Sequence, residues 1–293
     1  IPVTRQVHEV EALDRGEPLS PYLSRPFDAR PQAIQAVREV PRLVLWRIGA
    51  WGLHAAAAAG LAELATADMT DTDVLIIGGG PAGSTMATLT ARQGRRVVLL
   101  EKDHHPRFHI GESLLPGNVE LFDRLGVKDQ VADIGMPKFG IEFVPPDLDD
   151  RSYVDFCEGW DPSKDSAWQV RRSELDELLF RHAGKQGALT LEGAKVRQVD
   201  FDADGAVVRA VLAEGETRSW RTKFVVDASG RDTLLANKFK SKQKNPDHNS
   251  TALFGHFRNA RRLEGKREGN ISICWFEHGW FWFIPLADGT TSV

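Results

Sequence analysis

Two short apolar runs flank a glycine-rich loop and a helical stretch in the first half of the chain. Val74–Ile77 is a continuous apolar run, and Arg96–Leu100 contains a second one that leads to Glu101. Uninterrupted apolar runs are typical of strands buried on both faces of a parallel sheet. The residues between them predict a helix over Pro81–Gln93. Strand, helix and strand in this order, over about thirty residues, predict a β-α-β unit.

The rest of the chain adds elements of both kinds. A helix is predicted over Ser173–Gln186, and a β-hairpin over Val196–Val211 with its turn at residues 202–205. Phe224–Val226 is a further buried apolar strand, which ends at Asp227, and residues 251–285 are aromatic and rich in predicted strands. These elements together predict an α/β (α+β) fold.

The sequence changes in character at Met69. All twelve lysines follow this residue, whereas alanine, arginine and proline dominate before it. Residues 32–47 and 51–64 are predicted to be helical. We interpret residues 1–68 as an N-terminal extension of unknown role, partly helical: either a fused or read-through tail, or a small docking piece. Residues 69–293 form the second predicted domain.

The composition restricts the function classes. The 37 basic and 41 acidic residues give a net charge of −4, which argues against a general nucleic-acid binder. Cys157 and Cys274 are too few and too far apart for a disulfide framework, so a reducing, cytoplasmic location is expected. Arg47 and Glu63 interrupt the most apolar stretch, which leaves it short of the ~20 residues that a membrane span needs. No stable membrane insertion is predicted.

The glycine-rich loop Gly78–Gly83 fits the pattern G-x-G-x-x-G. Gly78 permits the tight turn, Gly80 lets the backbone approach a pyrophosphate, and Gly83 lets the helix pack closely on the strand. The helix N-terminus presents unpaired N–H groups and a positive dipole end to the phosphates. Glu101 lies about twenty residues further on, where an acid binds the ribose hydroxyls. The loop predicts a dinucleotide site but does not by itself distinguish NAD from FAD.

Three segments resemble the family of FAD enzymes that includes aromatic-ring hydroxylases and geranylgeranyl reductases. They are the glycine loop with its acid, Gln169–Arg172 before a helix, and Val225–Gly230 at a strand end. The resemblance implies a parallel, Rossmann-like FAD-binding sheet interleaved with an antiparallel substrate sheet. It also implies that Arg172 lies near the FAD and that the segment at Asp227 closes over it. Without the resemblance, Arg172 could pair with a surface charge and Asp227 could cap the next turn.

Two further motifs narrow the resemblance. Ile110–Pro116 reads I-G-E-S-L-L-P and Trp280–Pro285 fits W-x-W-x-I-P, as in flavin-dependent halogenases of the branch that acts on phenolic, pyrrole or carrier-bound aromatic substrates. The resemblance covers residues 71–293 and implies that the domain is incomplete at its C-terminal end. The cofactor-binding residues expected from the loop and the resemblance are Gly78, Gly80, Pro81, Ala82, Gly83, Glu101, Lys102, Gly111, Glu112, Ser113, Arg172 and Asp227.

The tryptophan motif also makes a structural prediction. On a strand, Trp280, Trp282 and Ile284 share one face, and the other face carries Phe281, Phe283 and Pro285. Both faces are bulky, so the strand is expected to be buried on both sides. The resemblance implies that Trp280, Trp282, Ile284 and Pro285 shield the flavin from the organic substrate. The alternative is an aromatic core strand with no further role.

Lys138 is the catalytic candidate. It follows the Gly-Glu-Ser motif and precedes a predicted strand over Phe139–Val144, as does the lysine that handles hypohalous acid in the halogenases. An ordinary lysine has a pKa near 10.4, so only about one in a few thousand is neutral at pH 7. A chloramine mechanism therefore requires burial, whereas a charged lysine could hold hypohalous acid by hydrogen bonding. The alternative is a solvated lysine at a strand start.

The resemblance predicts FADH2-dependent halogenation of an electron-rich aromatic substrate with O2 and chloride or bromide. A separate flavin reductase would supply the FADH2. The alternatives are an FAD-dependent monooxygenase or reductase on the same scaffold, or an inactive, truncated flavin-binding module. A metal site at His104, His105 and His109 is not expected. The basic residues at 238–244 and 261–267 are interpreted as solvated surface or as a docking site for a carrier protein.

Overall fold

The computed structural model describes residues 69–147, 150–246 and 250–293. The helices predicted over residues 32–47 and 51–64 lie outside these ranges. Among the described residues, no helix is long and apolar enough to cross a membrane.

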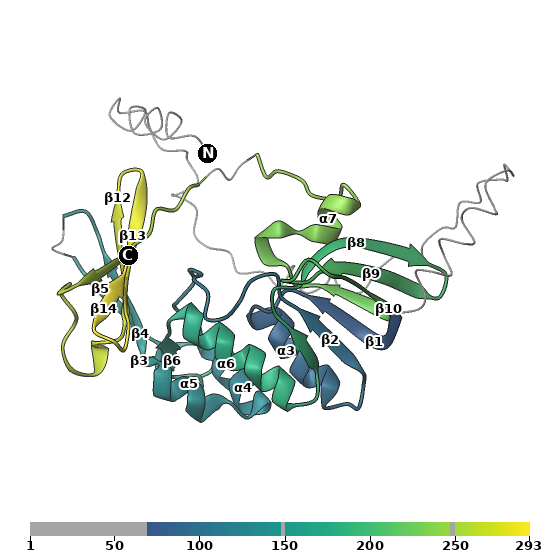
Figure 1. Cartoon of the computed structure of the whole chain (residues 1–293). Coiled ribbons are helices and arrows are strands. Elements are labelled where there is room, and N and C mark those ends of the chain that lie inside the picture. Colours follow the sequence, from purple (N-terminus) through teal and green to yellow (C-terminus); the bar gives the residue numbers. More distant parts are fainter. Residues whose placement is uncertain (1–68, 148–149, 247–249) are drawn as a thin grey trace, which may run out of the picture. The chain divides into compact units, whose positions relative to one another are not determined.

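A six-stranded sheet, with strand order β7-β2-β1-β10-β9-β8, carries the predicted β-α-β unit (Figure 1). Neighbours among the first four strands pair in parallel, whereas β10, β9 and β8 form antiparallel pairs. The strands are β1 (Met69–Ile77), β2 (Val97–Leu100), β7 (Leu189–Leu191), β8 (Lys195–Asp202), β9 (Gly205–Val211) and β10 (Thr217–Asp227). The parallel strands and the hairpin predicted from the sequence are confirmed.

Both faces of this sheet are covered, because alternate residues of its strands point to opposite sides. On one face, helices α3 (Pro81–Ala91) and α6 (Arg172–Lys185) pack together, and Phe180 contacts the layer that contains Ile76. On the other face, Leu75 joins a core with Val208 of β9 and Trp220 of β10. The antiparallel strands therefore fold over the face that the helices leave open.

Three further helices occur among the described residues. They are α4 (Pro116–Leu125), α5 (Lys128–Ile134) and the short α7 (Leu234–Lys238). α4 ends where Gly126 adopts φ +69°, a left-handed conformation that glycine reaches without strain. Phe122 of α4 and Val131 of α5 pack against Leu175 of α6 in a third cluster. Single 3-10 turns lie at Phe156–Glu158, Gly230–Asp232 and Gly265–Arg267.

A second six-stranded sheet has the order β11-β14-β13-β12-β4-β5. The β12–β4 pair is parallel and the other pairs are antiparallel. A separate two-stranded sheet joins β3 and β6. The strands are β3 (Met136–Lys138), β4 (Gly140–Val144), β5 (Ser152–Asp155), β6 (Ala167–Gln169), β11 (His256–Arg258), β12 (Ile271–Phe276), β13 (Gly279–Pro285) and β14 (Thr290–Ser292). Because β4 and β5 precede α6 whereas β11–β14 follow β10, the two sheets are interleaved in the sequence, as predicted.

Several element boundaries differ from the prediction, for example β1, which begins at Met69 and not at Val74. The helix predicted over Pro81–Gln93 ends at Ala91. The strand predicted over Phe224–Val226 is the end of a longer strand, β10, that begins at Thr217. The first half of β10 alternates polar residues with Trp220, and it pairs with both β1 and β9. Only its second half has the continuous apolar pattern that sequence reasoning detected.

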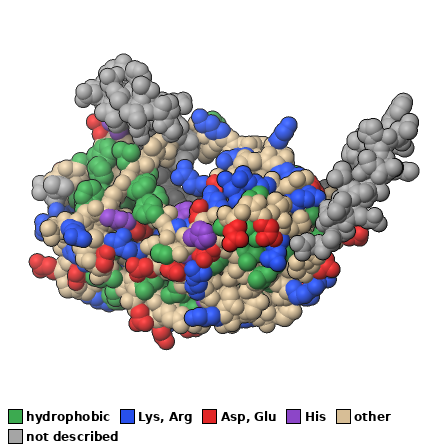
Figure 2. Space-filling model, viewed as in Figure 1, with side chains coloured by type: hydrophobic (Ala, Val, Ile, Leu, Met, Phe, Trp, Pro, Cys, Tyr) green, Lys and Arg blue, Asp and Glu red, His purple; other side chains and the backbone are tan. Residues whose placement is uncertain are grey.

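The prediction that the Trp280–Pro285 strand is buried on both faces is wrong. Trp280 is 49% exposed and Trp282 47% exposed, whereas Ile284 is buried. The reason is register: β4 pairs only with residues 271–274 of β12, and β14 only with Ile284 and Pro285 of β13. The outer half of the β12–β13 hairpin therefore has no strand on either edge among the described residues. Figure 2 shows hydrophobic side chains at the surface over this hairpin.

Candidate functional site

The glycine loop connects β1 to the N-terminus of α3, and its three key glycines meet different surroundings. At Gly78, which has φ +105°, a Cβ would lie 2.4 Å from the carbonyl oxygen of Ala228. At Gly83 it would lie 1.9 Å from the carbonyl oxygen of Gly78. At Gly80 the nearest atom would be Nη2 of Arg107, 3.6 Å away. Gly78 and Gly83 thus permit close packing, whereas Gly80 leaves the backbone open to a ligand.

The N-terminus of α3 carries no side-chain cap. Pro81 is its first residue and lacks an N–H group, and the first helical hydrogen bond runs from Ser84 N to Gly80 O over 2.9 Å. The preceding N–H groups of the first turn have no partner within the helix. Together with the helix dipole, these donors form an anion-binding end beside the open face of Gly80.

Glu101 at the end of β2 is buried and points at this loop. Its Oε2 accepts hydrogen bonds from Gly79 N at 2.7 Å and from Nη2 of Arg107 at 3.1 Å, and its Oε1 accepts one from Asp103 N at 3.0 Å. The carboxylate is therefore fixed at the edge of the dinucleotide loop. This is the location that the sequence predicted for a ribose-binding acid.

Arg107 is a residue of the site that sequence reasoning missed. Its Nη1 lies 3.4 Å from Oδ2 of Asp176, which is fully buried, and its Nε has no hydrogen-bond partner among the described residues. The side chain of Arg107 is only 11% exposed. A buried, incompletely paired cation beside a helix N-terminus fits a phosphate-bearing ligand. The sequence feature that could have indicated Arg107 is its position as the only arginine between Glu101 and the Gly-Glu-Ser motif.

Arg172 reaches the same cluster from the start of α6. Its Nε and Nη2 form a bidentate pair with Asp176 at 2.7 and 3.0 Å, and its Nη1 donates to the carbonyl oxygen of Ile110 at 2.8 Å. A Cβ on Gly111 would lie 3.2 Å from this guanidinium. Arg172 is therefore bonded into the site and is not a solvated surface charge.

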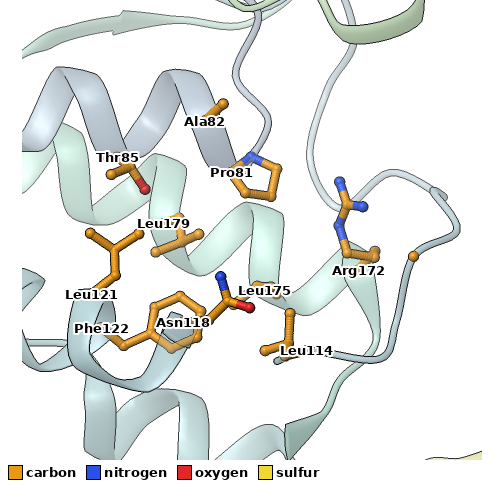
Figure 3. A pocket seen from close by; sticks show the side chains of 11 residues that line it. Pro81, Ala82, Thr85, Leu114, Asn118, Leu121, Phe122, Arg172, Leu175 and Leu179 are labelled. Atoms are coloured by element: carbon orange, nitrogen blue, oxygen red, sulfur yellow. The ribbon is translucent and has the colours of Figure 1, made fainter. Parts of the chain in front are cut away.

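A pocket of about 280 Å³ lies between the N-terminus of α3, helices α4 and α6, and the loop around Gly111 (Figure 3). Figure 3 shows Pro81 and Ala82 at one side and Arg172 at another. The other lining residues are Thr85, Gly111, Leu114, Asn118, Leu121, Phe122, Leu175 and Leu179. The lining is mostly apolar, with the glycine loop and the Arg172 guanidinium as its polar border.

Asp227 and Lys102 hold the chain around the site. Oδ1 of Asp227 accepts hydrogen bonds from the N–H and hydroxyl groups of Ser229, and Oδ2 accepts one from Leu235 N at 2.7 Å. Asp227 therefore caps the turn after β10 and the start of α7. Lys102 forms an ion pair with Asp232 at 2.5 Å, which joins the end of β2 to the segment that follows Asp227.

Lys138 is buried at the end of β3, with 1% of its surface exposed. Its Nζ donates to Oγ of Ser113 at 2.8 Å and to the carbonyl oxygen of Leu114, and it lies 5.5 Å from the ring centre of Phe156. Burial lowers the pKa of Lys138 from its ordinary value to about 8. The interpretation of Lys138 as a solvated surface lysine is therefore wrong, because β3 and the Ser113 loop enclose it.

His105 and His109, which follow β2, have different surroundings. His105 is buried against Phe180, and its Nδ1 lies 2.8 Å from Glu192. His109 lies nearer Arg107 and Arg172; burial and these positive charges lower its pKa. No group of potential metal ligands occurs among residues 69–147, 150–246 and 250–293.

The chain belongs to the family of FAD binding domains, whose model matches residues 71–285. The residues of the site fit this cofactor: an open glycine backbone and helix N-terminus for the pyrophosphate, a buried acid for the ribose, and an incompletely paired arginine.

Within this class the chain is homologous to flavin-dependent halogenases. It is 36% identical to the tryptophan 2-halogenase of Chondromyces crocatus over 229 residues, 76% of this chain and 43% of that protein. It is 32% identical to a 1H-pyrrole-2-carbonyl-[peptidyl-carrier protein] chlorinase of Pseudomonas fluorescens over 248 residues, 76% of this chain and 55% of that protein.

A solved structure supports the same assignment. The myxobacterial chondrochloren halogenase CndH superposes with a TM-score of 0.67 at 34% identity, over 76% of this chain and 52% of that chain. The chain thus spans about half the length of the proteins that it matches.

Proposed function

We propose that this chain is part of an enzyme that halogenates an electron-rich aromatic compound, using FADH2, O2 and chloride or bromide. The observation that carries the proposal is Lys138, a buried lysine bonded to the Gly-Glu-Ser loop beside the FAD site. Reduced FAD and O2 supply the oxidising equivalents that convert halide to hypohalous acid. The described residues then have to bind the cofactor and guide the hypohalous acid.

The proposed role of Lys138 follows from its hydrogen bonds and its pKa. Two of the three ammonium protons have acceptors in Ser113 and Leu114, which leaves one to donate to hypohalous acid and polarise it. With a pKa of about 8, about one Lys138 in ten is neutral at pH 7. The charged form therefore predominates at neutral pH, and we assign it the role of hydrogen-bond donor. The chloramine route is left to the minor, neutral form.

The other groups have proposed supporting roles. Glu101, Arg107 and Arg172 bind and orient the FAD, together with the glycine loop. Trp280, Trp282, Ile284 and Pro285 shield the flavin from the organic substrate, which favours oxidation of halide over hydroxylation of the ring. A separate flavin reductase supplies FADH2 in the cytoplasm.

A carrier-bound substrate is also proposed, and the carrier-protein chlorinase among the relatives supports it. Of the basic residues considered for docking, Lys240, Lys242 and Lys244 are exposed. In contrast, Arg262 donates to the carbonyl oxygens of Leu286 and Thr290. Arg262 is therefore less available to a carrier protein than the lysines after α7, whereas Arg261 and Lys266 are exposed like those lysines.

The test is an assay with a flavin reductase, NADH, FAD, O2 and bromide against free and carrier-bound aromatic substrates, read by mass spectrometry. Lys138→Met is expected to lower the bromination rate by about 10² or more, as loss of a directly acting polar group does. Lys128→Met, on the exposed side of α5, is the matched control. A hydroxylated product without bromine, or full bromination by Lys138→Met, contradicts the proposal.

A further inference from the structure

Glu112 is a buried carboxylate with one side-chain partner, His256. Its exposed fraction is 2%. Nε2 of His256 lies 3.0 Å from both Oε1 and Oε2 of Glu112. Among the described residues, His256 is the only side chain that forms a hydrogen bond or ion pair with this carboxylate. A buried carboxylate is costly unless it has a hydrogen-bond partner, and His256 supplies that partner.

The contact connects two parts of the chain that are far apart in the sequence. His256 begins β11, which pairs with β14 in the second sheet, whereas Glu112 lies in the loop that follows β2. Phe108 strengthens the junction, because its ring stacks on Phe254 with a centroid distance of 5.3 Å and meets His256 edge-on at 6.0 Å. His256 of β11 and Phe254 just before this strand therefore contact the loop at two points, Glu112 and Phe108.

The same loop is anchored from the opposite side through its backbone. The carbonyl oxygen of Glu112 accepts a hydrogen bond from Val170 N at 2.8 Å, just before α6. The neighbouring residues carry groups of the site: Gly111 lies against Arg172, and Ser113 accepts from Lys138. A movement of the Glu112 side chain therefore displaces groups on both sides of it.

We propose that His256 is a positioning residue of the FAD site. It acts through Glu112 and holds the loop of residues 110–114, called here the cofactor loop, in the conformation that receives the cofactor. This inference rests on FAD binding by the family and does not depend on the halogenation proposed above. The second sheet lies outside the dinucleotide motif. The inference therefore gives a residue of this sheet a role in the FAD site.

Three substitutions separate the hydrogen bond from simple packing. Leucine in place of His256 fills space but removes the donor, which leaves the Glu112 carboxylate buried and unpaired. Glutamine places an amide N–H near the position of the histidine Nε2. Asparagine carries the same amide on a side chain shorter by one methylene group, so it does not reach. The hydrogen-bond role predicts that only glutamine replaces histidine.

The experiment measures FAD affinity by titration of the full chain, together with the visible flavin spectrum and thermal unfolding. His256→Leu and His256→Asn are expected to raise the Kd for FAD about tenfold or more, as loss of a partner for a buried charge does. His256→Gln is expected to stay within about threefold of the wild type. Arg258→Gln, an exposed position on the same strand, is the control and keeps the wild-type Kd.

A double-mutant cycle with Glu112→Gln completes the test. If His256 acts through the Glu112 charge, His256→Leu changes the Kd by about twofold or less in the Glu112→Gln background. Equal effects in both backgrounds, FAD binding by His256→Gln as weak as by His256→Leu, or unchanged affinity in His256→Leu each overturn the proposal. Failure of the wild-type chain to bind FAD overturns it as well. Lack of halogenation with normal FAD binding counts only against the proposed function.

Discussion

The strands of the dinucleotide-binding sheet and the β12–β13 hairpin are both strongly apolar, yet they have different surroundings. Leu75 and Ile76 of β1 are fully buried, one on each face of the sheet. Trp280, Phe281 and Trp282 of β13 are each about half exposed, although their side chains are larger. The difference is that α3 and α6 cover one face of β1, whereas side chains of β8, β9 and β10 pack over the other face. An apolar sequence thus indicates that a strand can be buried, but the strand is buried only where neighbouring elements pack against it.

The largest expected effect contrasts two tryptophans from these two regions. Trp220 of β10 is fully buried, so Trp220→Ala is expected to lower the free energy of unfolding by about 3–5 kcal/mol. Trp282→Ala, at a half-exposed position, is expected to cost less than about 1 kcal/mol. Chemical denaturation of both variants measures the difference. Equal losses mean that the hairpin is packed in solution in a way that the described residues do not show.

The second prediction concerns the glycine loop. Gly83→Ala places a Cβ 1.9 Å from the Gly78 carbonyl oxygen, so the loop has to shift. We expect a stability loss of about 1–3 kcal/mol together with loss of measurable FAD binding. Gly80→Ala is the matched variant, because its Cβ meets only Arg107 at 3.6 Å. It is expected to keep the stability and to weaken FAD binding alone, and a comparable stability loss in both variants contradicts this division of roles.

The third prediction concerns the pH dependence of stability caused by Lys138. Burial lowers its folded-state pKa to about 8, below the unfolded value of 10.5. Between these two values the unfolded state binds more protons, so this residue makes stability rise as pH increases from about 8 to 10.5. The full contribution is on the order of 3 kcal/mol. The free energy of unfolding is measured as a function of pH for the wild type and for Lys138→Met, and the difference between the two curves isolates the contribution of Lys138. A difference that does not change with pH contradicts the burial assigned to this residue.

The assignment of the charged form of Lys138 to catalysis can also be tested kinetically. If protonated Lys138 is the active form, the rate of bromination falls as pH rises through about 8. If the neutral form is active, the rate rises through the same range. The rate is measured with a substrate that has no ionisable group titrating near this pH. The direction of the change then distinguishes a charged from a neutral active form of Lys138.

The smallest effect is expected at the ion pair that ties α6 to the second sheet. Arg171 at the start of α6 donates to Asp288 and to the hydroxyl of Thr290. Hydrogen bonds from Thr290 and Arg171 lower the pKa of Asp288 to about 2, despite the opposing effect of partial burial.

Because Asp288 is 44% exposed, Arg171→Gln is expected to cost only about 0.5–1 kcal/mol. This contribution is present at pH above about 4 and is lost as pH falls toward 2. It should also shrink in high salt. A cost well above this range, or one insensitive to salt, means that the pair is less accessible to solvent than the structure shows.

Much of the first sheet could be predicted because its signals are local. Val74–Ile77, the glycine loop and Glu101 act within one β-α-β unit, so their spacing along the chain is close to their spacing in the fold. Lys138 could be predicted as a candidate only through the halogenase resemblance. Its burial could not, since it depends on β3, Ser113 and Phe156. The boundary of β10 was missed because pairing with β9 stabilises a half that lacks a continuous apolar pattern.

The sequence by itself determined the dinucleotide loop, its acid and the motifs of the family, because these depend on residue type at fixed local spacing. The interleaved second sheet was predicted only through the resemblance to that family. Only the tertiary structure showed that Arg107 faces Glu101 and Asp176, that Lys138 is buried with a lowered pKa, and that His256 pairs with Glu112. It also showed that the aromatic hairpin is half exposed. Each of these depends on elements that are distant in the chain, and burial and pairing free energies arise only where such elements meet.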